Sequence, residues 1–251
     1  QMAAKIVFSS RFWPVSISRY ALRALKRRDD VEVISAGPFT GNRIRWQGGM
    51  KLDIDPSLYA PPDIVLEAEG FFYPITEVEK WLKEHGQELP DIWINWNSDF
   101  SLSGRPTKGL VVNVFVDPPT LNYDLERDWG DFNFCMQRHY MQPGDIWLPY
   151  AYDPEFHARL PWLTAGDDGK GGFEYDISHI GVINKARMVF QQLISGSGHK
   201  TFFKTGPSYQ QVRDIYQKSL SIFNWSTRGE ITARFFEALA MGRPLLTDRL
   251  D

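Results

Sequence analysis

Residues 209–246 read YQQVRDIYQKSLSIFNWSTRGEITARFFEALAMGRPLL and carry the clearest pattern in the chain. A strand that leads through a glycine-containing turn into a helix binds phosphate groups well, because the unpaired N–H groups and the positive end of the helix dipole point at the turn. We therefore expect a phosphorylated ligand beside Gly229. The pattern predicts these elements in order: a helix over 209–218, a strand over 220–223, a helix over 230–241 and a strand over 245–247.

Two charged residues of the 230–241 helix, Arg234 and Glu237, are three positions apart and can therefore face the same side. A cation for a diphosphate beside a carboxylate for a ribose diol is what a nucleotide-sugar site needs. The alternative interpretation is an amphipathic helix of an α/β domain with ordinary surface charges.

This region resembles the donor-binding segment of GT-B glycosyltransferases of the group 1 kind, and it is most similar to the spore-maturation-protein-B-like (CgeB-like) branch. That branch carries an R-x-F-E core followed by A-x-G and a strand. The matching residues are 234–237, 240–242 and 244–247, together with the tyrosine helix at Ile215-Tyr216, the strand 220–224 that ends in asparagine, and the interdomain segment LPYAYDP at 148–154.

The resemblance implies a GT-B fold, with two Rossmann-like domains of mostly parallel sheets that face one another across a cleft. Residues 1–149 would form the acceptor-side domain and residues 150–251 the nucleotide-sugar donor domain. A complete second domain of this kind would continue for several elements beyond Asp251. The implied reaction is transfer of a sugar from a nucleoside diphosphate sugar, with UDP-sugar favoured and retention more expected than inversion. No cofactor or metal is implied, because GT-B enzymes generally stabilise the leaving diphosphate with a helix dipole and basic side chains.

Carried over by resemblance, Glu237 would bind both ribose hydroxyls, since a carboxylate accepts two hydrogen bonds. Glu230 would lie near the donor sugar as a catalytic residue. Six residues separate these two glutamates where the common motif has seven. Either the loop is one residue tighter, or Glu230 is only a first-turn residue that suits the helix dipole.

The expected diphosphate site consists of Thr227, Arg228, Gly229 and the backbone up to Thr232, with Arg234 either contacting the phosphates or bracing the loop. Lys185 and Arg187 are candidates for a basic pair at the leaving group. Their alternative is that they are solvated charges opening a helix, where cations are not favoured. Lys204 and Gly206 follow a strand and are candidates for the base pocket, where glycine permits close backbone approach.

The first half should supply the acceptor site and any base. Asp99 and Asp117 each follow an expected strand, where a carboxylate can act as a general base. The alternative is turn capping, which aspartate often performs. Residues 9–14 (SSRFWP) follow the first strand and contain no glycine, so we expect them to meet the acceptor rather than a phosphate.

Short apolar runs alternate with amphipathic segments over the rest of the chain, as in a mostly parallel α/β sheet. Residues 37–62 and 165–172 are rich in glycine and polar residues and predict loops. The expected strands are 5–9, 31–35, 63–67, 91–96, 110–116, 132–136, 145–148, 177–183 and 200–203, and the remaining expected helices are 16–28, 75–85 and 185–194.

Composition bounds the function class. The 251 residues carry a net charge of −3 with 43% hydrophobic and 24% charged residues, so the chain is expected to be globular, without general attraction to nucleic acid or anionic membrane. Its single cysteine, Cys135, lies in an apolar run and predicts a buried thiol without an internal disulfide. With no secretory signal and no run approaching about 20 apolar residues, the expected location is the cytoplasm.

Other chemistries lack a pattern. The five histidines form no i, i+4 ligand pair, and Asp53 and Asp55 lie in a Gly/Pro-rich segment, so no metal site is expected. Three other functions remain open on the same fold: a nucleotide-sugar epimerase or phosphorylase, a non-catalytic module that binds nucleotide-sugar or protein, and a transferase that modifies nucleic acid. The acceptor is expected to be a glycan, a protein or a small molecule.

Overall fold

The computed structural model describes residues 3–12, 16–39, 60–97, 99–118, 121–155, 157–160, 172–181, 183–204, 209–226 and 229–248. These residues form two compact units, and the chain passes from the first to the second between Pro149 and Tyr150. Each unit has its own sheet and core and is described by itself.

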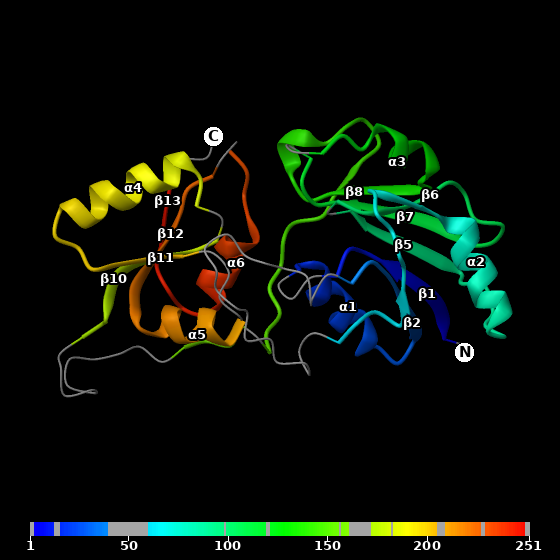
Figure 1. Cartoon of the computed structure of the whole chain (residues 1–251), viewed down its shortest axis with the longest axis horizontal. Helices are drawn as coiled ribbons and strands as arrows, with labels where there is room; N and C mark the ends of the chain where they lie inside the picture. The colour runs from blue at the N-terminus through cyan, green and yellow to red at the C-terminus, as the bar shows by residue number, and fades with distance from the viewer. Residues whose placement is uncertain are drawn as a thin grey trace. The chain divides into compact units, whose positions relative to one another are not determined.

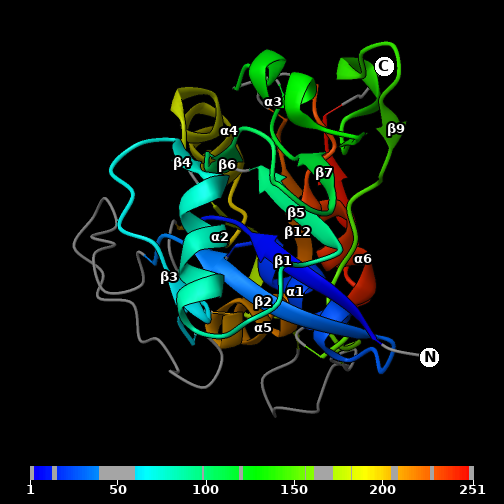
Figure 2. The ribbon, with the colours of Figure 1, turned by 90° about the vertical axis from the view of Figure 1, so that its right-hand side faces the viewer.

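The first unit is built on a seven-stranded sheet in the order β3-β2-β1-β5-β7-β8-β9, in which every neighbouring pair is parallel. The order reverses after β1, as in Rossmann-type sheets. The strands appear at the centre of this unit in Figures 1 and 2. Their bounds are β1 Ala4–Ser9, β2 Val31–Gly37, β3 Ile64–Val65, β5 Ile92–Asn97, β7 Leu110–Phe115, β8 Phe132–Cys135 and β9 Ile146–Trp147.

Helices α1 (Ser18–Lys26), α2 (Ile75–Glu84) and α3 (Asp124–Trp129) connect these strands, and a 3₁₀ turn, η1, covers Arg138–Tyr140. A small parallel pair, β4 (Phe72–Pro74) and β6 (Ser101–Ser103), lies beside them. The apolar face of α2 packs on the sheet in the main core. That core combines Ile75, Val78 and Leu82 of the helix with Val7, Trp93 and Val111 of the sheet.

The second unit has a four-stranded, fully parallel sheet in the order β11-β10-β12-β13. Figure 1 shows α4 on one side of this sheet and α5 on the other, as right-handed crossovers running in opposite directions require. Ile180, Tyr216, Ile222, Ala238 and Met241 form its core. The bounds are β10 Tyr175–Ile180, α4 Lys185–Gly196, β11 Thr201–Lys204, α5 Tyr209–Gln217, β12 Ser219–Asn224, α6 Ala233–Ala240 and β13 Leu245–Thr247.

The α/β class with mostly parallel sheets, expected from the sequence, is confirmed. The predicted helix start at Glu230 is wrong by three residues. Thr232 has an extended backbone (φ −96°, ψ 164°) and occupies the N-cap position, so α6 begins at Ala233. The predicted strand 177–183 ends earlier, at Ile180, because Gly181 has φ +150° and turns the chain away.

Two further findings concern single predictions. Cys135 is fully buried, as expected, and burial raises the pKa of its thiol. No helix in the described part of the chain is long and apolar enough to cross a membrane. The expected loop over 165–172 and most of the expected loop over 37–62 lie outside the described residues.

Candidate functional site

Arg234 of α6 joins the carboxyl ends of two neighbouring strands in the second unit. Its Nη1 donates to Asn224 Oδ1 at the end of β12 (2.6 Å), and its Nη2 donates to the carbonyl of Ile180 at the end of β10. Gly181 leaves the space that this guanidinium occupies, since a Cβ there would collide with Nη2. Arg234 therefore braces the ends of β10 and β12, and its expected roles of contacting the phosphates or bracing the loop stay predictions.

Glu237 lies one turn further along α6 and is partly exposed, with 18% of its side chain accessible. Its Oε1 is 3.7 Å from Nε2 of His157, and burial lowers the pKa of this histidine although Glu237 opposes the shift. Burial raises the pKa of the Tyr216 hydroxyl to about 12. Arg234 opposes this rise and Glu237 adds to it, so both residues lie near this hydroxyl. The two residues therefore share one side of the helix, as their spacing predicts.

The two candidates at the start of α4 differ sharply. Arg187 is 7% exposed and donates to the carbonyl of Trp225 from Nε (3.1 Å) and Nη2 (2.7 Å), so the interpretation as a solvated charge is wrong for it. Burial lowers the pKa of Arg187, Arg234 lowers it further, and Glu230 opposes both. Lys185 is exposed at the first position of the helix. Arg187 on α4 and Glu230, which follows β12, are therefore close enough for their charges to interact.

The remaining donor-side candidates lie around the same strand ends. Thr232 Oγ1 donates to Asn224 Oδ1 over 3.4 Å, and Gly229 has φ +73°, which its lack of a side chain permits. Lys204 is exposed at the end of β11, with its Nζ over the ring of Phe202. Three candidates, Thr227, Arg228 and Gly206, lie outside the described residues.

In the first unit, Asp99 follows β5 with a left-handed backbone (φ +72°), which is strained for a residue with a side chain. Arg11, from the expected acceptor loop, holds it there. Its Nε is 3.2 Å from Asp99 Oδ1, and its Nη2 donates to the carbonyls of Asp99 and Gly70. Burial raises the pKa of Asp99, against the opposing effect of Arg11. A carboxyl with a raised pKa is a reasonable proton acceptor near neutral pH.

Asp99 lines a cavity of about 240 Å³ together with Asn97, Ser101 and Glu126. Glu126 of α3 is 4% exposed, accepts from Ser101 Oγ over 3.4 Å, and has its pKa raised by burial. Ser101 also donates to Asn97 Oδ1. The apolar and remaining polar lining consists of Phe71, Phe72, Phe100, Leu121, Asn122 and Tyr123.

Asp117 does not line this cavity and is exposed at the end of β7. Its N–H donates to Tyr123 Oη (3.3 Å) and its carbonyl accepts from the N–H of Leu121 (3.0 Å). The backbone of Asp117 makes both bonds, and the two roles expected for its side chain, general base or turn cap, stay predictions.

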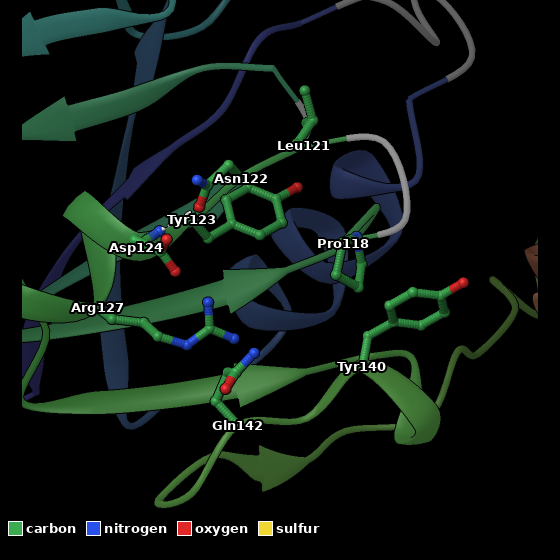
Figure 3. A pocket seen from close by; sticks show the side chains of 8 residues that line it. All are labelled: Pro118, Leu121, Asn122, Tyr123, Asp124, Arg127, Tyr140 and Gln142. Carbon is green, nitrogen blue, oxygen red and sulfur yellow. Dashed lines mark hydrogen bonds between the residues drawn. The ribbon is translucent and has the colours of Figure 1, made fainter.

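A second hollow, of about 400 Å³, shares Leu121, Asn122 and Tyr123 with the first (Figure 3). Its cation, Arg127, is already paired with Asp145, with Nη2 and Oδ2 2.7 Å apart, and lies over the ring of Phe115. The hollow therefore offers little free positive charge to an anionic ligand.

Among the described residues, no three His, Cys, Asp or Glu side chains lie close enough together to hold a metal ion. Asp53 and Asp55, at which the sequence predicts no metal site, lie outside those residues.

Sequence reasoning missed three residues of these sites. Glu126 belongs to a short charged helix, DLERDW, that has no apolar periodicity, and His157 lies beyond the interdomain segment 148–154, where the sequence predicts no element. Asn97 is the last residue of β5 and lies one position beyond the predicted strand 91–96.

No protein-family model matches the chain, and no curated protein gives a significant match. Solved structures do resemble it. One is a Listeria monocytogenes protein described as a UDP-N-acetylglucosamine 2-epimerase, with a TM-score of 0.52 and 12% identity over 99% of this chain and 80% of the other. Another UDP-N-acetylglucosamine 2-epimerase gives 0.53 and 12% over 98% and 79%. A glycosyltransferase of avilamycin A biosynthesis, AviGT4, gives 0.49 and 10% over 97% and 78%.

At such identities the likeness concerns the fold alone. The chain has an α/β fold with mostly parallel sheets that matches GT-B proteins.

Proposed function

We propose that the chain is a glycosyltransferase that moves a sugar from a nucleoside diphosphate sugar, preferably a UDP-sugar, to an acceptor, without a metal ion. The observation that carries the proposal is the position of Glu237. Its carboxylate is partly exposed next to two buried groups, Tyr216 and His157, on a helix that follows a strand and a glycine turn. A fixed and accessible carboxylate of this kind can accept hydrogen bonds from both hydroxyls of a ribose.

The remaining roles follow from the placement of the other groups. In this proposal the backbone of Gly229–Thr232 and the start of α6 face the diphosphate, where the helix dipole favours negative charge. Arg234 and Arg187 keep the strand ends in place around it through Asn224, Ile180 and Trp225. Their positive charges offset the charge that develops on the leaving diphosphate.

In the first unit, Asp99 is the proposed base or acceptor-hydroxyl ligand, because burial raises the pKa of its carboxyl. Glu230 is proposed near the donor sugar, and Lys204 near the base. Retention of configuration and the group 1 assignment with its CgeB-like branch belong to the same proposal and rest on the sequence resemblance. A cytoplasmic location also belongs to it and rests on the composition.

The test combines donor binding with one substitution. Melting temperatures are measured against UDP-, GDP-, TDP- and ADP-sugars, and donor hydrolysis is followed without acceptor. Glu237→Ala should weaken donor binding about tenfold to a hundredfold, since a hydrogen bond to a charged group contributes about 1.5–3 kcal/mol. Glu237→Gln should give a smaller loss in the same direction.

Glu174→Ala is the control, because Glu174 is an exposed acid of the same unit paired with Lys218. It should leave binding unchanged. If no nucleotide-sugar raises the melting temperature, or if Glu237→Ala binds donor as well as the parent protein, the proposal fails. Binding without hydrolysis or transfer would instead indicate a non-catalytic module.

A nucleotide-sugar epimerase is the second candidate, favoured by the two UDP-N-acetylglucosamine 2-epimerases with TM-scores above 0.5. An epimerase must move a proton at the sugar itself. Incubation of the protein with UDP-N-acetylglucosamine in deuterated water separates the two functions. Deuterium incorporation into the sugar ring without an acceptor supports the epimerase, whereas transfer or hydrolysis without exchange supports the glycosyltransferase.

A further inference from the structure

Three residues that line the 240 Å³ cavity of the first unit, Asn97, Asp99 and Glu126, each carry a buried polar atom without a hydrogen-bond partner among the described residues. Asp99 Oδ1 has the charge of Arg11 beside it, whereas Glu126 Oε2 and Asn97 Nδ2 have no printed ion pair. Their side chains are more than nine-tenths buried, at 4% and 1% exposure. Each unmet buried polar group costs about 1–3 kcal/mol, so two of them on residues that line one cavity point to a ligand.

The two atoms differ in hydrogen-bonding capacity. Asn97 Nδ2 donates, while a carboxylate oxygen of Glu126 accepts. A hydroxyl group both donates and accepts, so neighbouring hydroxyls on one small molecule satisfy both atoms.

We propose that this cavity binds one neutral sugar ring of the acceptor, with Asn97 and Glu126 bonded to its hydroxyls and Phe72 against its apolar face. The inference rests on the glycosyltransferase function proposed above, and it narrows the acceptor from any glycan, protein or small molecule to a carbohydrate.

Cavity size agrees with one ring. A water molecule occupies about 30 Å³ in the liquid, so 240 Å³ holds roughly eight waters, which is the space of one hexose rather than two. Phe71 and Phe72 line the cavity and are 60% and 42% exposed. Phe72 meets the edge of Trp129, with ring centroids 5.8 Å apart, which fixes its ring. An exposed aromatic face at a polar cavity suits the C–H face of a pyranose.

Charge disfavours the other small ligands. The carboxyls of Asp99 and Glu126 repel phosphates and carboxylates, and the nearby cation, Arg11, is engaged with Asp99 and the carbonyl of Gly70. A cationic ligand would pair with these carboxyls but would leave the amide donor of Asn97 Nδ2 without an acceptor. A neutral polyol has neither conflict.

Asp99 then has a place in the same cavity. Its strained backbone and its contacts with Arg11 hold the carboxyl at the cavity wall, where it can take the proton of the hydroxyl that accepts the new sugar. In that step the hydroxyl oxygen bonds to the donor sugar, its proton passes to Asp99, and the nucleoside diphosphate leaves with the bonding electrons.

The experiment measures binding of methyl glycosides of glucose, galactose, mannose and N-acetylglucosamine to the full chain by saturation-transfer NMR. Methyl glucuronide and spermidine serve as anionic and cationic probes. At least one neutral glycoside should bind. Glu126→Gln and Phe72→Ala should each weaken that binding about threefold to tenfold, as the loss of one hydrogen bond or one stacking contact does.

Two matched variants control for folding. Glu79→Gln alters another buried glutamate of this unit, one that accepts from Thr107, and Phe132→Ala removes another exposed phenylalanine. Both should bind the glycoside like the parent protein. The inference fails if no neutral glycoside binds, if a charged probe binds in its place, or if binding survives both cavity substitutions.

Donor binding separates this inference from the proposed function. A melting-temperature rise with UDP in the absence of any glycoside signal overturns the sugar cavity and leaves the proposed function standing. Glycoside binding without any response to nucleotides overturns the proposed function and leaves the sugar cavity standing, because the cavity would then serve a carbohydrate-binding role.

Discussion

Arg234 contacts two strand ends in the second unit, and Gly181 provides the room for it. The guanidinium reaches the Ile180 carbonyl through space that any side chain at Gly181 would fill. The backbone of Gly181, with φ +150°, is also one that other residues rarely adopt. At the residue scale, the position of the predicted donor cation therefore depends on a glycine 53 positions earlier in the chain.

Gly181→Ala should lower the free energy of unfolding by about 2–3 kcal/mol, because it adds backbone strain and displaces a buried hydrogen-bonded cation. Urea unfolding measures the change. Gly196→Ala is the matched control. Gly196 ends α4, and no heavy atom lies within 4 Å of a Cβ placed there, so alanine should be neutral or stabilising by up to about 1 kcal/mol. Equal effects of the two substitutions would contradict the role of Gly181.

At the element scale, a row of buried polar side chains crosses the first sheet at one register. Ser9 Oγ donates to Asn95 Oδ1 (2.7 Å), Asn95 Nδ2 to Asn113 Oδ1 (3.0 Å), and Asn113 Nδ2 to Asn133 Oδ1 (3.0 Å). These residues are directly paired between neighbouring strands β1, β5, β7 and β8. Asn113 also donates to the backbone carbonyl of Glu126 (2.6 Å), which ties the row to the cavity.

A double-mutant cycle tests this row. Asn113→Val removes its bonds to Asn95 and Asn133, although the carbonyl of Glu126 keeps its bond from the N–H of Gly130. The substitution should cost about 1–3 kcal/mol of unfolding free energy. Asn95→Val should cost a similar amount. The double variant should be more stable than the sum of the two losses predicts, by about 1 kcal/mol, because it removes both partners of one bond.

Ser221→Ala in the second unit supplies the reference pair. Combined with Asn113→Val, it should give additive changes within about 0.5 kcal/mol, since the two sites share no partner. If the asparagine pair proves additive to the same degree, the amides are not coupled and the row contributes no shared stability.

The sequence predicted elements that have an apolar period and missed those without one. The strands around Val7, Val112 and Ile222 follow from short apolar runs, and the last helix follows from the spacing of its apolar residues. Helix α3 was missed because its six residues are mostly charged, and strands β4 and β6 because three residues carry no pattern. Asn113 lies inside the predicted strand 110–116, but its place at the centre of the polar row depends on the neighbouring strands.

Some residues of the candidate site could be predicted from local sequence spacing, and others could not. Glu237 and Arg234 could be predicted because their spacing of three positions on one helix places them on the same side. The partners that give them their environment, His157, Asn224 and Gly181, are distant in sequence and come together only when parallel strands align their carboxyl ends. In the first unit, Glu126 and Asn97 are likewise distant in sequence, and both accept from Ser101. Such encounters depend on the order of the strands, and a single sequence specifies strands more directly than their order.

At the scale of the whole molecule, the two units carry separate cores and separate candidate sites. The buried apolar residues of the first unit include Val7, Trp93 and Val111, and those of the second include Tyr216, Ile222 and Met241. The proposed donor residues described by the structure all follow residue 149, and the sugar cavity is lined only by residues before it. Each ligand should therefore stabilise a different part of the chain.

Hydrogen exchange of the intact protein, read by mass spectrometry of peptides, tests this separation. UDP at 100 times its Kd should stabilise the unit that binds it by about 2.7 kcal/mol, which slows exchange roughly a hundredfold where amides open by unfolding of that unit. We expect this protection in β10, β12 and α6, because the ends of the two strands hold Arg234 and because Glu237 lies on α6. The strands β1, β5 and β7 should exchange as before. A methyl glycoside should give the opposite pattern, with protection around β6 and α3. If UDP instead protected the first sheet alone, the donor would bind there, and the roles of the two units would have to be exchanged.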